Sequence, residues 1–311
     1  MTDPDSTHRF PAAYDLHLHT HWSFDATLEP GAHFRRATEL GLRCIAITEH
    51  HHLDSAPEVA RLAALYPQLR VLHAAEFSVT TSLGGIDLLC YGLPPGPGGP
   101  LAGVVERYRR WQREIGEAMS RGMQSYGFAY DEAGRLDVLR SYRAREVLKH
   151  QGLGSQILRK REVDHFVACG WFSTPEEASE LQLRILKEFP RPPFPAVEEV
   201  VPAVKAAGGL VVIAHPARYF QGDNLRRMET LREECALDGL ECAHHAVHPE
   251  LTRFYRNYCR RHGLLSTAGS DSHHAEHLAP PTGPWHEVPE RKFACHLGEE
   301  AWLDELLERL S

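Results

Sequence analysis

The chain has 311 residues, a net charge of −8 and seven scattered cysteines without a C-x-x-C pair. A chain of this length can bury a full core, and a single α/β barrel would use most of it. The negative charge argues against a protein that coats nucleic acid, and no apolar run approaches the ~20 residues that span a bilayer. Because the first ten residues lack a basic segment followed by an apolar core, we expect a cytoplasmic protein with reduced cysteines and no membrane association.

The charge is unevenly distributed. Residues 101–161 contain 13 Arg/Lys against 7 Asp/Glu, a local net charge of +6, which leaves −14 for the remainder. A basic block beside an acidic body suggests that one region handles an anion while another gathers cations. The 21 histidines exceed ordinary structural use, so we expect some of them to bind metal.

The N-terminal part of the chain alternates between strand and helix patterns. Gly41 suits the C-terminal cap of the first helix, and the Pro/Gly-rich residues 92–100 can continue neither a helix nor a strand. After the opening strand that begins at Tyr14, the predicted strands cover residues 43–48, 70–75 and 86–91, and the predicted helices cover residues 28–40 and 55–65.

Residues 95–195 are predicted to form a mostly helical insertion that covers the active-site rim. The first helix is expected at 104–122. Thr174 and Pro175 begin another helix, with a capping residue, a proline in the first turn and acidic residues after it. The proline-dense residues 189–195 mark the end of the insertion.

The alternation of strands and helices then resumes. Strands are predicted at 210–214, 239–242 and 264–268, and helices at 197–207, 225–236, 249–262 and 300–310. Seven strands alternating with helices favour a parallel sheet closed into a barrel. We therefore predict an α/β barrel from residues 12–94 and 196–290, followed by a C-terminal helix within 291–311.

Polar residues come at the ends of these strands, where barrel active sites gather. His17 and His19 are one residue apart, so both imidazoles leave the same face of an extended segment. Asp25 follows them, and Asp87 lies within its strand. The other candidates at strand ends are His50, Glu76, His215, Glu241, Asp271 and His273.

Histidine and carboxylate without cysteine suit zinc, manganese or iron, and this number of ligands would hold two or three divalent ions. Glu76 is the natural bridge between adjacent ions, which could activate a water and hold the oxygens of a phosphoryl group. Phosphoester hydrolysis is therefore the first expectation. A supporting or solvent-facing role is expected for Asp15, Glu49, His51 and His52, and a surface or core role for His21, His33, His73 and His245.

Five motifs together resemble the PHP (polymerase and histidinol phosphatase) family. They are DLHLHT at 15–20, ITEH at 47–50, Glu76, IAHPARY at 213–219 and AGSDSHH at 268–274. The resemblance implies a distorted barrel of seven β/α units and a site for up to three metals. It also implies that His17, His19, Glu76 and Asp271 hold the first ion, Glu76 and His215 the second, and Asp25, His50 and His273 the third.

Two features depart from the family pattern. The usual Pro-His-Ile-Ala segment of the insertion is not evident, and residues 158–170 read LRKREVDHFVACG. A family histidine that would hold the second ion corresponds to Asp87, and a carboxylate there favours manganese or magnesium over zinc. Within the family, the chain resembles nucleoside 3′,5′-bisphosphate phosphatases and 5′-to-3′ exoribonucleases, through EEVVPAVKAAGGLVVIAHPARY at 198–219, a GLE strand and a His-Pro-Glu helix start. This likeness implies a small phosphorylated substrate, such as a nucleotide or short RNA. No stable protein partner is expected.

The expected mechanism is in-line attack on phosphorus by a hydroxide held between metal ions, with Glu76 and Asp271 as catalytic carboxylates. Arg218 is the first candidate for a phosphate clamp, and Arg143 and Arg145 are further substrate candidates. His248 could protonate the leaving oxygen, contact substrate, or only begin a helix. The alternatives are a histidinol-phosphate or cyclic-phosphate phosphoesterase of the same fold, and a non-catalytic metal-binding or nucleic-acid-interaction module.

Overall fold

The computed structural model describes residues 10–96, 98–283 and 290–311, so the N-terminal segment on which the expectation about a leader depends lies mostly outside the described residues. The chain divides into two compact units. One consists of Met1–Ala102 with Ala196–Ser311, and the other of Gly103–Pro195. The first unit carries the barrel and the second is helical.

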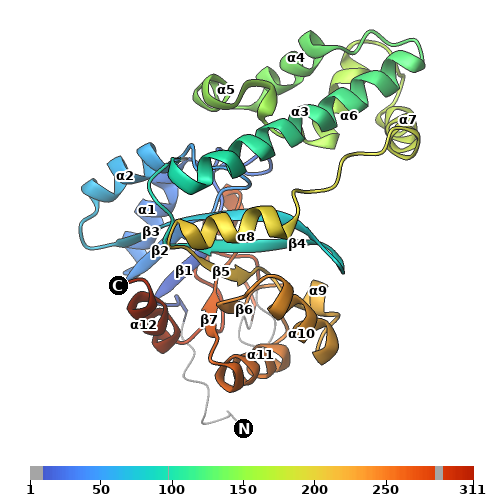
Figure 1. The fold of residues 1–311 in the computed structure, drawn as a ribbon. Helices are drawn as coiled ribbons and strands as arrows, with labels where there is room; N and C mark the ends of the chain where they lie inside the picture. Colours follow the sequence, from blue (N-terminus) through green and yellow to red (C-terminus); the bar gives the residue numbers. More distant parts are fainter. Residues whose placement is uncertain (1–9, 97, 284–289) are drawn as a thin grey trace. The chain divides into compact units, whose positions relative to one another are not determined.

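The first unit is built on a seven-stranded sheet whose strands are neighbours in chain order (Figure 1). A parallel bridge between Leu18 and Ser272 brings the two edges of the sheet together, so the barrel is nearly closed. This confirms the predicted fold class. The strands are β1 (Tyr14–Leu18), β2 (Cys44–Ile47), β3 (Arg70–Thr81), β4 (Gly84–Tyr91), β5 (Leu210–Ile213), β6 (Gly239–Ala243) and β7 (Leu265–Ala268).

The expectation of an all-parallel sheet is wrong at β4, which runs antiparallel to both β3 and β5. The chain does not leave the sheet after Ala75. Strand β3 instead continues to Thr81 and turns directly into β4, with Gly84 at φ 102°. A short hairpin requires antiparallel strands, whereas parallel neighbours need a long crossover. As a result Glu76 lies in the middle of β3 and not at its carboxyl end.

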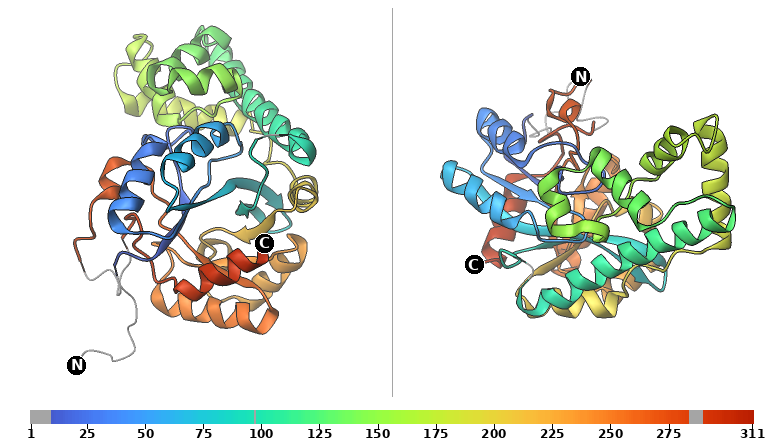
Figure 2. Two further views of the ribbon diagram at one scale, coloured as in Figure 1. Left: turned by 90° about the vertical axis from the view of Figure 1, so that its left-hand side faces the viewer. Right: turned by 90° about the horizontal axis from the view of Figure 1, so that it is seen from above.

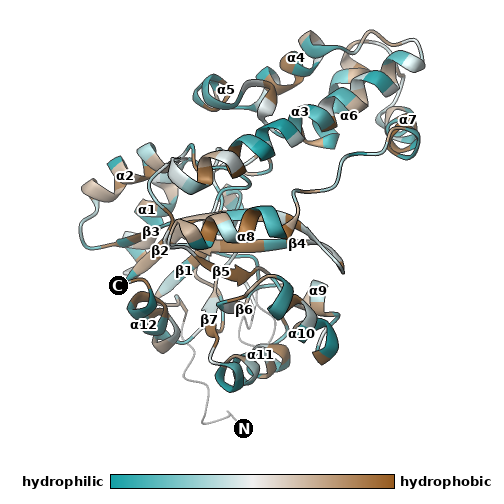
Figure 3. Cartoon of the chain, in the orientation of Figure 1, coloured by the Kyte–Doolittle hydropathy of each residue, from teal (hydrophilic) through white to brown (hydrophobic). Residues whose placement is uncertain are grey.

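Helices lie outside the strands of this unit (Figures 1 and 2). Gly41 ends the first of them in the left-handed conformation at φ 71°, as the sequence predicts. Helix α8 carries hydrophobic and hydrophilic residues on different sides, which suits a helix that packs on β3 and β5 (Figure 3). The helices are α1 (Pro30–Leu40), α2 (Ala56–Leu65), α8 (Val197–Ala206), α9 (Ala217–Phe220), α10 (Leu225–Glu234), α11 (Pro249–His262) and α12 (Glu300–Arg309).

The C-terminal part of the chain completes the barrel core. Phe293 is fully buried with Leu18, Phe34 and Ile45, in a cluster that joins β1, β2 and α1. Burying a phenylalanine side chain stabilises a fold by about 1.5–3 kcal/mol. The segment before α12 therefore belongs to the barrel, and its backbone is fixed beside β1.

The second unit consists of α3 (Ala102–Ser125), α4 (Glu132–Tyr142), α5 (Arg145–Gln151), α6 (Arg159–Ala168) and α7 (Pro175–Glu188). It has its own core, which includes Met123, Phe166 and Ile185. The side chain of Thr174 accepts the N–H of Glu177 at 3.3 Å, so the predicted cap of α7 is present. Across the described residues, no helix is both long and apolar enough to cross a bilayer.

Candidate metal centre

The structure brings all nine expected metal ligands together into three overlapping groups in the barrel unit. They come from the ends of β1, β2, β5 and β7, from the middle of β3 and β4, and from the loop after β1. The residues are His17, His19, Asp25, His50, Glu76, Asp87, His215, Asp271 and His273.

The first group surrounds the Nε2 atoms of His17 and His19, which are 3.1 Å apart. Oε2 of Glu76 lies 3.3 Å from the first and 3.1 Å from the second, and Oδ1 of Asp271 lies 3.4 Å from both. Four ligands placed tetrahedrally around zinc at 2.0–2.1 Å would be separated from one another by about 3.3–3.4 Å. The donor set and its spacing therefore fit a divalent ion.

The second group uses the other oxygen of Glu76. Oε1 lies 3.2 Å from Nε2 of His215, which is 3.8 Å from Oδ2 of Asp87. The hydroxyls of Ser78 and Tyr219 each donate to one oxygen of Asp87, both at 2.5 Å. These two bonds fix the carboxylate in its orientation towards His215.

The third group is organised around Asp25. Its Oδ2 lies 3.4 Å from Nε2 of His50 and 3.5 Å from Nε2 of His273. The ring of His19 packs between these two imidazoles, with its centroid 4.3 Å from each. Nδ1 of His50 is also 3.3 Å from Oε2 of Glu76, so Glu76 touches all three groups.

Hydrogen bonds fix the tautomer of several of these histidines. Nδ1 of His17 faces the carboxylate of Glu241 at 2.9 Å, and Nδ1 of His273 faces the backbone carbonyl of Asp271 at 2.7 Å. Both partners can only accept, provided that Glu241 is ionised, so in the neutral ring Nδ1 carries the proton and Nε2 keeps its lone pair. In both rings that lone pair is directed into the ligand groups, as a metal-binding imidazole requires.

The tautomer of His19 is set by a longer chain of bonds. Ser23 donates its hydroxyl proton to Glu49 and therefore accepts from Nδ1 of His19 at 3.1 Å. Glu49 also accepts the hydroxyl proton of Thr20. Glu49 thus supports the ligand groups from behind and does not join them, which is one of the roles that the sequence left open.

Other buried histidines have the opposite tautomer and bind the backbone. Nε2 of His33 donates to the carbonyl of His19 at 2.9 Å, Nε2 of His52 to that of Trp22 at 3.0 Å, and Nε2 of His296 to that of Tyr14 at 2.7 Å. None of these three rings directs a free Nε2 lone pair at the ligand groups. Part of the high histidine content is therefore structural.

The electrostatics of the groups favour a cation. Burial alone would lower the pKa of His17 and His50, but the carboxylates around them outweigh it. Glu241 and Glu76 hold the pKa of His17 well above its usual value, and Asp25 and Glu76 raise that of His50 to about 10. Burial opposes ionisation of Glu76 as well, yet the charges of His17 and His50 lower its pKa well below the usual range. The same negative field would attract a divalent metal ion.

The backbone around the groups is unusually constrained. A Cβ on Gly269 would lie 2.6 Å from the backbone nitrogen of His17, so only glycine allows β1 and the end of β7 to come this close. His215 and Asp271 adopt positive φ values of 29° and 56°, which side-chain-bearing residues rarely adopt. Such conformations cost free energy and persist only where the surrounding structure holds them in place. They are found most often at functional sites.

Comparison with known proteins decides the family. A family model described as the PHP domain matches residues 15–191. The chain belongs to this family. It is similar to the 3′,5′-nucleoside bisphosphate phosphatase of Chromobacterium violaceum, with 25% identity over 90% of this chain and 98% of that protein. It is also similar to the 5′-3′ exoribonuclease Rnm of Escherichia coli, with 26% identity over 94% and 91%.

Solved structures agree with this assignment. A metal-dependent phosphoesterase from Bifidobacterium adolescentis matches with a TM-score of 0.66 and 26% identity over 96% of both chains. A protein from Chromobacterium violaceum described as an amidohydrolase matches in fold, with a TM-score of 0.64 and 23% identity over 96% of this chain and 97% of that one. This PHP-domain protein is a metal-dependent phosphoester hydrolase.

The residues expected to contact substrate lie outside the three ligand groups. Arg218 is exposed on α9, directly after His215-Pro216. His248 is exposed at the N-terminal cap of α11, so the helix-start role is the one visible in its contacts. Arg145 is exposed in the first turn of α5. Neither Arg218, His248 nor Arg145 belongs to the three ligand groups.

Arg143 does not fit the expectation of an open substrate contact. Its side chain is buried in the second unit, where it donates to Ser155 at 3.1 Å and to Gln151 at 3.4 Å. A buried guanidinium needs such partners because leaving its donors unpaired is costly. The contacts give Arg143 a role in holding the insertion together.

The sequence patterns do not single out His244 or Arg291, and they predict a surface or core role for His245. His244 and His245 directly follow β6, the same signal that identified His215 after β5, so they could have been found. Arg291 donates to Oδ2 of Asp271 at 2.8 Å and to Nε2 of His245 at 3.1 Å. No pattern in the sequence pointed to Arg291, because it lies after the last strand.

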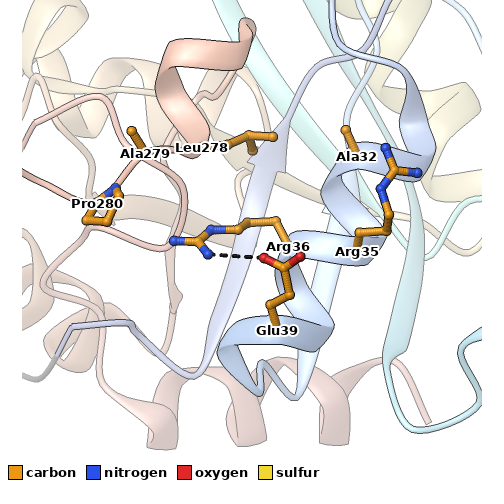
Figure 4. A pocket seen from close by; sticks show the side chains of 7 residues that line it. All are labelled: Ala32, Arg35, Arg36, Glu39, Leu278, Ala279 and Pro280. Atoms are coloured by element: carbon orange, nitrogen blue, oxygen red, sulfur yellow. Dashed lines mark hydrogen bonds and ion pairs between the residues drawn. The ribbon is translucent and has the colours of Figure 1, made fainter.

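A separate pocket of about 440 Å³ lies beside α1 and is lined by Ala32, Arg35, Arg36, Glu39 and residues 278–280 (Figure 4). Arg36 is paired with Glu39 at 3.1 Å across one helical turn, so part of its charge is neutralised within the pocket. None of the seven lining residues belongs to the ligand groups. The chemistry of this PHP domain therefore lies elsewhere in the barrel unit.

Proposed function

We propose that this chain is a phosphoesterase that hydrolyses phosphate esters of small nucleotides, either a 3′,5′-bisphosphate nucleotide or a short oligoribonucleotide. The position of Glu76 is the main support for the proposal that several ions act together. Glu76 directs Oε2 towards His17, His19 and His50 and Oε1 towards His215. A carboxylate shared in this way can bridge two cations and offset their repulsion, as in two-metal phosphatases.

We propose that the three groups hold two or three divalent ions in the arrangement that the family resemblance implies. In this assignment Asp271 completes the first site, Asp87 the second, and Asp25 the third. The first site, with two histidines and two carboxylates, suits zinc, iron or manganese, whereas the carboxylate of Asp87 gives the second site harder ligands and favours manganese. Bound ions would supply Lewis-acid stabilisation of the phosphoryl group and lower the pKa of a water molecule.

The remaining steps belong to side chains of this chain. Glu241 holds the imidazole of His17 and also accepts the backbone N–H of His215 at 2.6 Å, so one buried carboxylate positions two candidate ligands. Arg218 is exposed two residues after Pro216, and its guanidinium can bind a phosphate through two parallel hydrogen bonds. We propose that Arg218 holds the substrate phosphate that is not cleaved.

The nucleotide class is supported by the relatives. The curated relatives reported above carry names that specify a nucleoside bisphosphate or RNA as their substrate, and this chain spans more than nine-tenths of each. At 25–26% identity these names support the substrate class without assigning one compound. The proposal therefore extends to either kind of nucleotide substrate.

A substrate panel tests the proposal, with inorganic phosphate as the readout for phosphomonoesters and released mononucleotides as the readout for oligoribonucleotides. The full chain would be stripped with a chelator, reloaded separately with manganese, zinc or iron, and assayed on 3′,5′-bisphosphate nucleotides, short oligoribonucleotides, histidinol phosphate and cyclic phosphates. We expect the highest kcat/KM on the first two. A clear preference for histidinol phosphate or a cyclic phosphate would overturn the substrate proposal.

The salt dependence separates the two nucleotide candidates. Each phosphate contact made by Lys or Arg to a single strand contributes about −0.7 to the slope of log affinity against log salt. If short RNA is the substrate, kcat/KM on oligoribonucleotides should fall more steeply with salt than kcat/KM on mononucleotides. Equal slopes would favour the mononucleotide.

A further inference from the structure

His244 directs an unsatisfied hydrogen-bond donor at the ligand groups. The residue is 2% exposed, and its Nδ1 accepts the backbone N–H of Ala246 at 3.0 Å. A backbone N–H can only donate, so Nδ1 must carry the lone pair and the neutral ring must carry its proton on Nε2. Within the described residues this Nε2 has no hydrogen-bond partner.

The position of the ring places this donor beside the first and second groups. The centroid of the His244 ring lies 5.8 Å from that of His17 and 5.5 Å from that of His215. Its Nε2 is 3.7 Å from Oδ2 of Asp271, which is too long for a hydrogen bond. A buried donor left without a partner costs about 1–3 kcal/mol, which selection tolerates where a ligand supplies the partner.

The hydrogen bond that Nδ1 of His244 accepts does not suit a metal ligand, although Asp271 lies close to the ring. To bind a metal through Nε2 it would have to move its proton to Nδ1, where the proton would face the N–H of Ala246. His17 shows the opposite arrangement, since Nδ1 donates to Glu241 and Nε2 keeps its lone pair. The two neighbouring histidines are therefore prepared for different partners, one for a cation and one for a hydrogen-bond acceptor.

The surroundings also permit an anion to approach. Asp271 would repel a phosphate oxygen, but the guanidinium of Arg291 donates to its Oδ2 at 2.8 Å. Arg291 is itself oriented by a bond from its Nε to Nε2 of His245 at 3.1 Å. Arg291 thus neutralises the side of Asp271 that faces His244, and His245 holds Arg291 in place by accepting its Nε–H.

We propose that His244 is a catalytic residue whose Nε2–H donates a hydrogen bond to a non-bridging oxygen of the phosphoryl group under attack. This proposal rests on the function proposed above, in that it places a phosphoryl group beside the first and second ligand groups. The neutral imidazole acts as a fixed electrophile, and it neither gains nor loses a proton in the reaction. Donors preorganised in this way stabilise the charge that develops in the transition state.

His244→Phe removes the donor and keeps the ring size, and His244→Gln retains an amide N–H donor. For the metal-reloaded phenylalanine variant we expect kcat on the best phosphoester of the panel to fall by about 10²–10³-fold, as for the loss of one oxyanion donor. The affinity for inorganic phosphate, measured by calorimetry, should weaken by about tenfold, which corresponds to one hydrogen bond to a charged group. The glutamine variant should recover most of both losses, and metal content by elemental analysis should be unchanged in both.

His296→Phe is the matched control, because it removes another buried histidine of the same unit whose ring binds the backbone carbonyl of Tyr14. It should lower the melting temperature without changing the affinity for phosphate. Unchanged phosphate affinity in a folded, metal-loaded His244→Phe protein would overturn the proposal. Loss of bound metal in that variant would also overturn it, because His244 would then be a ligand.

A measurement on the wild-type protein covers the case in which the phenylalanine variant does not fold. With ¹⁵N-labelled histidine, the Nε2–H resonance of His244 should be visible and should shift when inorganic phosphate is added to the protein loaded with zinc, which is diamagnetic. A protonated Nδ1 would refute the proposal, and so would an Nε2–H resonance whose chemical shift does not change when phosphate is added. Neither phosphate binding nor this spectrum depends on which nucleotide is cleaved, so a failure of the substrate proposal can be told apart from a failure of this one.

Discussion

Glu241→Gln should weaken metal binding at the first site although Glu241 belongs to none of the proposed ligand sets. The carboxylate accepts two bonds, from Nδ1–H of His17 at 2.9 Å and from the backbone N–H of His215 at 2.6 Å. In the glutamine variant the backbone N–H keeps the carbonyl oxygen, so the amide NH₂ turns towards His17. Nδ1 must then accept, the proton moves to Nε2, and the lone pair that would bind metal is lost.

The expected size of the effect follows from this geometry. Removing the carboxylate partner of a metal-binding histidine typically costs 10–100-fold in metal affinity, or about 1.4–2.7 kcal/mol. The lower end applies if His17 rotates to keep its lone pair directed at the ion. The upper end applies if the reversed tautomer persists, because Glu241 is fully buried and no solvent replaces its charge.

The assay is a competition titration of each metal against a chelator of known affinity, together with elemental analysis of the dialysed protein. Glu162→Gln is a matched control, because Glu162 is also a buried glutamate but contacts Tyr130 and Gln182 in the second unit. The control should bind metal as the wild type does. Wild-type metal affinity in a folded Glu241→Gln protein would refute the tautomer argument.

Three further outcomes are expected. Gly269→Ala should lower the free energy of unfolding by about 1–3 kcal/mol in denaturant titration, because its Cβ would collide with the backbone of His17; an unchanged midpoint would contradict the close approach of β1 and β7. Burial raises the pKa of Glu162 from 4.5 to about 7, so the folded state retains a proton that the unfolded state releases, and stability falls as pH rises between these values. Glu162→Gln should therefore gain up to ~3 kcal/mol relative to wild type between pH 4.5 and pH 7, less the cost of a mismatched bond to Gln182; a pH-independent difference between the two proteins would contradict this. Asp87→His should shift the metal preference of the reloaded protein from manganese towards zinc, since imidazole is the softer ligand; an unchanged order of affinities would remove Asp87 from the second site.

Local patterns were sufficient for much of the fold. The alternation of buried strands with amphipathic helices depends on residues close in sequence, and so do the cap at Thr174 and the left-handed end at Gly41. The pattern at β3 and β4 predicts the strands but not their direction, because an apolar strand has the same composition whether its neighbour is parallel or antiparallel. Only pairing across the sheet, such as Ser78 opposite Asp87, distinguishes the two.

The sequence by itself determined most of the side chains that could gather around cations, because strand ends of one barrel meet at one rim and His17-x-His19 must share a face. Glu76 and Asp87 lie within their strands and are not explained in this way. Tertiary structure alone decided what each imidazole can do there. His17 and His244 are the same residue type a few ångströms apart, yet one meets a carboxylate and the other a backbone N–H, and this leaves a lone pair on the first and a proton on the second. The partners that set these tautomers come from distant parts of the chain or from turn geometry, which no short pattern records.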